Sequence, residues 1–73
     1  MKKYTQKEMR MMVRTGMAQD ITNASYESVE KLNLEKIGFS TGIYGMNGGV
    51  FRERDTKELY VVIARNTLLF QLA

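Results

Sequence analysis

Cysteine, histidine and proline are all missing from this chain. Without cysteine, the protein can form neither a disulfide nor a thiolate metal site. Without histidine, it lacks the usual general base and the commonest metal ligand. We therefore expect no metal and no other cofactor.

The chain also lacks a long apolar run. No stretch approaches the roughly 20 apolar residues that a membrane-spanning helix requires. The charged start, residues 1–8, has no apolar segment behind it, unlike a secretory signal. We expect a cytoplasmic protein with no membrane partner.

With 73 residues, the sequence is expected to form one domain, residues 1–73. A chain of this size buries roughly 60% of the surface that its unfolded form exposes, so its stability should be modest. Small domains often gain the missing stability by self-association. The net charge of +3 is unevenly distributed, because residues 1–14 carry five lysines and arginines against Glu8 alone. Residues 15–40 carry two basic and four acidic residues.

A first helix is predicted from about residue 6 to residue 14 or 15. Thr5 and Glu8 have the spacing of a capping box, in which each side chain accepts a hydrogen bond from the backbone N–H of the other residue. Gly16 is expected to end the helix in the left-handed conformation, with Met17 packing just past it. The apolar face of this helix is formed by Met9, Met12, Val13 and Met17.

A second helix is predicted from about Ser25 to Leu32 or Leu34. It follows a connector, residues 20–25, that is rich in capping residues. Its inner face would be formed by Tyr26, Val29 and Leu32.

The second half of the chain has the pattern of an antiparallel β-meander. Asn47-Gly48 has the composition of a two-residue hairpin turn, and residues 55–57 predict a second turn. Strands are expected at about residues 39–45, 49–54 and 58–64, with a candidate fourth strand at 68–72. The predicted fold class is α+β, with two N-terminal helices packed on one face of a three- or four-stranded antiparallel β-meander.

The third predicted strand is apolar on both faces. Alternation places Leu59, Val61 and Ile63 on one face and Tyr60, Val62 and Ala64 on the other. Such a strand is either central and covered on both sides, or has one face that meets a partner. The second alternative predicts that this face meets another protein or, as the simplest case, a second copy of the chain in a homodimer related by a two-fold axis. Its interface candidates are Tyr44, Tyr60 and Val62.

A row of basic residues gives a second candidate surface. Lys3, Lys7, Arg10 and Arg14 follow helical spacing, and such a row can contact phosphates without reading bases. The alternative is a solvated helix face that keeps a small protein soluble.

Two other patterns are better explained by structure. The glycines at 42, 45, 48 and 49 precede a strand and not a helix, and no Gly-Lys-Ser/Thr follows, so they predict a turn and not a phosphate loop. In the run Met9-Arg10-Met11-Met12, Met9 and Met12 are expected to fill the core and Met11 to be exposed.

Three segments resemble a group of small uncharacterised proteins encoded by phages and conjugative elements of Gram-positive bacteria. They are DITNASYE (residues 20–27), IGFSTGIYGMNGG (37–49) and LYVVIARNT (59–67). Their motifs are turn glycines and a core strand. The resemblance implies an accessory protein of a mobile element, active in regulation, DNA handling or interference with host defence, and it transfers no functional residue.

Neither a nucleophile–base pair nor a metal cluster can be assembled from the sequence, so we expect no enzyme. The leading prediction is a small module that acts through protein–protein contacts, as a regulator, adaptor or anti-defence inhibitor. The alternative is a nucleic-acid-binding accessory protein that uses the basic N-terminal helix.

Overall fold

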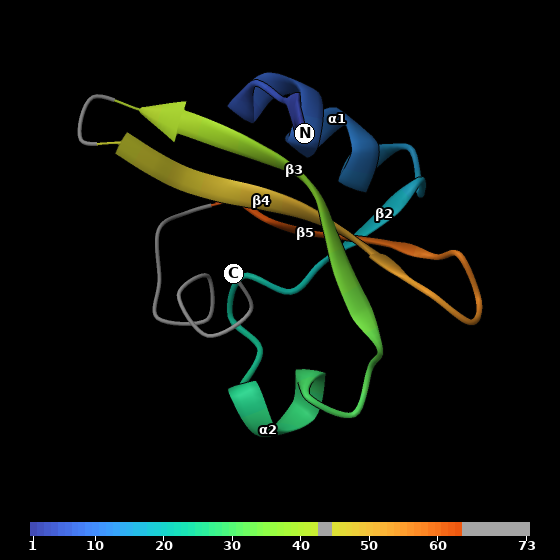
Figure 1. Cartoon of the computed structure of the whole chain (residues 1–73). Coiled ribbons are helices and arrows are strands. Elements are labelled where there is room, and N and C mark those ends of the chain that lie inside the picture. Colours follow the sequence, from blue (N-terminus) through green and yellow to red (C-terminus); the bar gives the residue numbers. More distant parts are fainter. Residues whose placement is uncertain (43–44, 64–73) are drawn as a thin grey trace.

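The computed structural model describes residues 1–42 and 45–63. Their elements run along the chain in the order shown in Figure 1. They are β1 (Lys2–Lys3), α1 (Gln6–Arg14), β2 (Ala18–Asp20), α2 (Tyr26–Val29), β3 (Leu34–Gly42), β4 (Gly45–Glu53) and β5 (Leu59–Val62).

The fold is α+β, as expected, but the sheet is mixed. Over the described residues it has five strands in the order β1-β3-β4-β5-β2. The three central strands form the predicted antiparallel meander. At its two outer edges, β1 pairs with β3 and β2 pairs with β5, both in parallel. The purely antiparallel prediction is therefore wrong, because strands of two and three residues are too short to show an alternating pattern.

The predicted capping box of α1 is confirmed. The Thr5 hydroxyl accepts from the Glu8 N–H at 3.0 Å, and the Glu8 carboxylate accepts from the Thr5 N–H at 3.0 Å. Gly16 follows the helix with a φ of 81°, in the left-handed region. The predicted packing of Met17 is wrong, because the chain turns directly into β2 and Ala18 takes the buried position, which leaves Met17 62% exposed.

The second helix is much shorter than predicted. It spans only Tyr26–Val29, and the Ser25 hydroxyl caps it by accepting from the Ser28 N–H at 3.2 Å. Leu34 does not belong to it, because Leu34 begins β3 and pairs with Glu53 of β4. Pairing with β4 draws this part of the chain out of the helical conformation.

The two helices cover opposite faces of the sheet (Figure 1), and not one face as predicted. On the α1 face, a buried cluster joins Met9, Met12, Ala18, Val50 and Val61. On the α2 face, a second cluster joins Ile21, Val29, Phe51, Tyr60 and Val62. The predicted alternation along β5 is therefore confirmed, and β5 is covered on both sides by its own chain.

The hairpin turn predicted at Asn47-Gly48 is wrong, because both residues lie inside β4. Gly48 pairs with Ser40, and the last pair of this ladder is Gly42 with Gly45. A Cβ on Gly48 would lie 2.7 Å from the Met9 Cε and 2.8 Å from the Val62 oxygen. Glycine is needed here for close packing of α1 on the sheet, not for a turn.

The turn predicted at residues 55–57 is confirmed. β4 ends at Glu53 and β5 begins at Leu59. Lys57 has a φ of 68°, and its N–H donates to the Glu53 oxygen at 2.7 Å. The candidate fourth strand at 68–72 lies outside the described residues.

Candidate binding surface

The outer side of α1 carries most of the predicted basic row. Lys7, Arg10 and Arg14 are all exposed, and helical periodicity places them opposite the buried Met9 and Met12. None of the three cations forms an ion pair with a described residue. Their charges therefore face solvent without an acidic neighbour bound to them.

Lys3 does not continue this row. It is exposed in β1, where it pairs with Phe39, whereas Lys2 pairs with Gly38. Gly38 pairs in turn with Val50, which faces α1. Because neighbouring residues of a strand point to opposite faces, Lys2 lies on the α1 side of the sheet and Lys3 on the other side. We therefore define the basic face as Lys2, Lys7, Arg10 and Arg14.

An apolar groove of about 330 Å³ lies beside the basic face, and sequence reasoning missed it. It is lined by Lys2, Tyr4, Glu8, Met11, Met12 and Met17, and we call it the methionine groove. Met11 is 44% exposed, as predicted for a residue off the buried side of α1. One signal for this groove was present in the sequence, because the chain has six methionines, more than its core requires.

Tyr4 forms a wall of the methionine groove because the sheet makes room for its ring. A Cβ on Gly38 would lie only 2.3 Å from the Tyr4 Cε2, so no larger residue fits beneath the ring. The Tyr4 N–H donates to the Phe39 oxygen at 2.7 Å, which fixes the backbone. The Lys2 ammonium lies 4.9 Å from the centre of the Tyr4 ring, in a cation–π arrangement.

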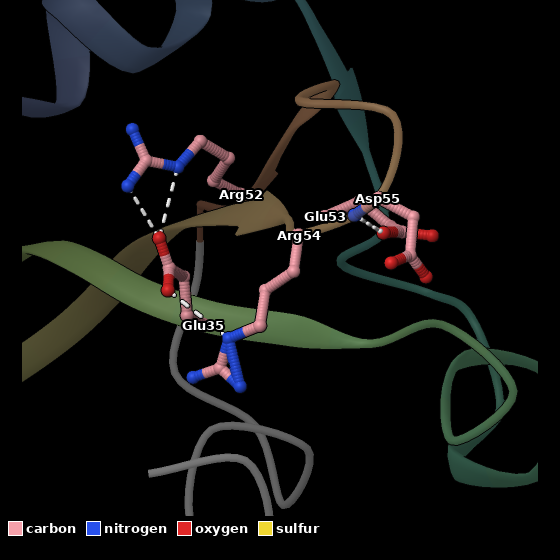
Figure 2. Close-up of polar contacts among 5 residues, drawn as sticks. All are labelled: Glu35, Arg52, Glu53, Arg54 and Asp55. Atoms are coloured by element: carbon pink, nitrogen blue, oxygen red, sulfur yellow. Dashed lines mark hydrogen bonds and ion pairs between the residues drawn. The ribbon is translucent and has the colours of Figure 1, made fainter.

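Two arginines near the turn between β4 and β5, Arg52 and Arg54, share one ion-pair partner within the chain. Figure 2 shows Arg52 and Arg54 converging on the carboxylate of Glu35. The Arg52 Nε donates to Glu35 Oε1 at 2.9 Å, and the Arg54 Nε donates to Glu35 Oε2 at 3.0 Å. The hydrogen bond from Arg52, helped by the nearby charges of Arg52 and Arg54, holds the pKa of Glu35 below its usual value. This cluster joins β3 to β4, and each of its two arginines is already bound to Glu35 although the cluster keeps a net charge of about +1.

Two of the predicted interface residues are buried. Tyr60 and Val62 pack in the α2-side cluster, and Val62 has no exposed surface. The Tyr60 hydroxyl donates to Glu58 at 3.0 Å, and burial raises the pKa of Tyr60. Tyr44 lies outside the described residues. Tyr60 and Val62 therefore do not form an exposed apolar patch.

The described residues bring together no group of three or more acidic side chains that could hold a metal ion. Over residues 1–42 and 45–63, neither helix has the length and the apolar character needed to cross a bilayer. The surface features established for this part of the chain are the basic face and the methionine groove beside it.

We compared the chain with known protein families, curated proteins and solved structures. No family model matches the chain, and neither a curated protein nor a solved structure matches it.

Proposed function

We propose that the protein is a non-enzymatic binding module that contacts nucleic-acid phosphates through its basic face. The observation that carries this proposal is that the cations on α1 are exposed and form no ion pair with a described residue. Lys7, Arg10 and Arg14 are exposed and have no ion-pair partner among the described residues, whereas Arg52 and Arg54 are paired with Glu35. Cations without such partners can neutralise phosphates and release counterions, which is the main source of sequence-independent affinity.

Burial of Tyr60 and Val62 favours this function over a homodimer formed through the sheet. A dimer of that kind would need an exposed apolar sheet face. The basic face needs no rearrangement. Nucleic-acid binding also agrees with the resemblance to small proteins of mobile elements, because DNA handling is one of the activities that this resemblance implies.

The basic face has the character of a phosphate-positioning surface and not of a base reader. Its cations lie along one short helix and one edge strand. Such contacts fix a protein on the nucleic-acid backbone but carry no sequence information by themselves. We therefore expect similar affinity for duplexes of unrelated sequence and strong dependence on salt.

Fluorescence anisotropy with a labelled generic duplex, measured over a series of salt concentrations, tests the proposal. The slope of log K against log salt should be about −0.9 per phosphate contacted. The double variant Lys7→Ala/Arg10→Ala should flatten this slope by about 1.8, since two contacts are lost.

The matched control is Lys3→Ala/Lys31→Ala, which removes the same net charge from exposed lysines outside the basic face. It should keep the slope of the unmodified protein. Equal slopes in the two double variants, or no binding at low salt, would overturn the proposal.

A further inference from the structure

The methionine groove presents apolar side chains that the core does not use. Met11 is 44% exposed and Met17 is 62% exposed, and both line the groove together with Tyr4 and the buried Met12. Methionine side chains are unbranched and polarisable, so a surface of this kind adapts to the shapes of varied apolar partners.

The charged residues around the methionine groove indicate which charge its ligand would carry. Lys2 forms part of the wall and is held over the Tyr4 ring. Lys7 and Arg14 lie four residues before and three residues after Met11, on the same exposed side of α1. The one acid in the lining, Glu8, keeps its negative charge while it accepts a hydrogen bond from the Thr5 N–H, so the three cations Lys2, Lys7 and Arg14 outnumber it around the groove. Acidic groups that flank an apolar segment would therefore meet cations on both sides of Met11.

We infer that the methionine groove binds an acidic amphipathic helix of a partner protein. Such a helix presents apolar side chains at i, i+3 and i+4, and these would enter between Tyr4, Met11 and Met17. Glutamates beside the apolar stripe would face Lys2 and Lys7. Addition of a strand at β1 is a poorer fit, because an edge of two residues offers few backbone groups for pairing.

The inference is separate from nucleic-acid binding, because it depends on apolar contacts in the groove. An acidic partner would nonetheless lie next to the basic face. The affinity for the partner should therefore fall with salt less steeply than the affinity for a duplex, because burial of apolar surface is not screened.

Synthetic labelled peptides of about 18 residues, a length that gives five helical turns, provide the probes. The first has leucines at i, i+3, i+4 and i+7, glutamates beside this stripe and alanines at the remaining positions, because alanine favours the helix and a peptide made mostly of glutamate would repel itself. The second has the same composition with the leucines scrambled, and the third replaces every glutamate by lysine. Anisotropy titrations on nuclease-treated protein should show binding of the first peptide only.

The test variant is Met11→Ser/Met17→Ser, and the matched control is Tyr26→Ser, which changes an equally exposed apolar residue on the other side of the sheet. The test variant should weaken binding of the first peptide by at least about tenfold, since two apolar contacts are lost. Tyr26→Ser should bind as the unmodified protein does. All of these substitutions are at exposed positions, and thermal denaturation verifies that each variant is folded.

Four outcomes would overturn the inference. The first is equal binding of the scrambled peptide, which would mean that charge alone is recognised. The second is unchanged binding in Met11→Ser/Met17→Ser, and the third is no binding of the first peptide at all. The fourth is a dimer in sedimentation equilibrium that the Met11→Ser/Met17→Ser variant abolishes, which would identify a second copy as the occupant. Duplex binding by Met11→Ser/Met17→Ser is measured in parallel. If this variant still binds the duplex, the proposed nucleic-acid function stands even where the inference about the groove fails.

Discussion

The side-chain amide of Gln6 donates hydrogen bonds to both oxygens of Asn47, at 3.3 Å to the backbone oxygen and 3.1 Å to Oδ1. This contact joins the first turn of α1 to β4, although the two residues are 41 positions apart. The neighbouring Gly48 lies beneath Met9 of the same helix. Together with the buried cluster on the α1 face, this small part of β4 therefore helps to fix the position of α1, and with it the basic face and the methionine groove.

Substitution of Gly48 by alanine should destabilise the protein by about 1–3 kcal/mol, because the added methyl group overpacks the contact between α1 and the sheet. The Met9 Cε can move, but the Val62 oxygen, 2.8 Å from the added carbon, belongs to the backbone of β5. Urea denaturation measures the loss. The control is Thr41→Ala at an exposed position of β3, which should stay within about 0.5 kcal/mol of the unmodified protein. Identical midpoints for the two variants would contradict the packing role of Gly48.

Removal of the helix cap should also lower stability. Thr5→Ala leaves the Glu8 N–H without its acceptor and is expected to cost about 1 kcal/mol. Thr5→Ser keeps the hydroxyl and should retain most of the stability. Thermal unfolding of the two variants under the same conditions makes the comparison, and a Thr5→Ser variant as unstable as Thr5→Ala would show that the hydroxyl is not the source of the effect.

The Glu35 cluster should make stability depend on pH in the acid range. The pKa of Glu35 is lowered in the folded state from an ordinary value of 4.5, so the unfolded state takes up the proton first. The stabilisation is therefore present above pH 4.5 and is lost as the pH falls below this value through the folded pKa. In Glu35→Gln, the slope of unfolding free energy against pH in this range should be smaller.

Glu30→Gln serves as the control for the pH experiment, because Glu30 is exposed at the end of α2 and has no ion-pair partner among the described residues. Its acid dependence should match that of the unmodified protein. A Glu35→Gln variant with the same slope as Glu30→Gln would mean that the ion pairs with Arg52 and Arg54 do not persist in solution.

The two lysines of β1 should differ in their contribution to nucleic-acid binding. Lys2 lies on the α1 side of the sheet with the basic face, whereas Lys3 points to the other side. Lys2→Ala should flatten the salt slope by about 0.9, and Lys3→Ala should change it little. Because both variants lose the same charge, anisotropy titrations that give equal slopes would indicate attraction by net charge and not by a defined face.

Local sequence signals determined the elements of this protein that depend on short-range contacts. The spacing of Thr5 and Glu8 predicted the start of α1, and Gly16 predicted its end. Residues 55–57 predicted the turn into β5, and alternation along β5 predicted which of its side chains share a face. In each case the stabilising contact joins residues a few positions apart, or follows from the period of the strand, so the sequence is sufficient.

Tertiary structure decided where these elements lie and what they expose. Asn47-Gly48 has the local preference of a turn, yet packing against Gln6 and Met9 of α1 places it inside a strand. Parallel pairing of Lys2–Lys3 with β3 determines which lysine joins the basic face. The methionine groove exists only because Tyr4 and Met17, which are far apart in the first part of the chain, meet beside α1. These outcomes depend on contacts between distant segments, whose free energies exceed the weak local preferences that a single sequence displays.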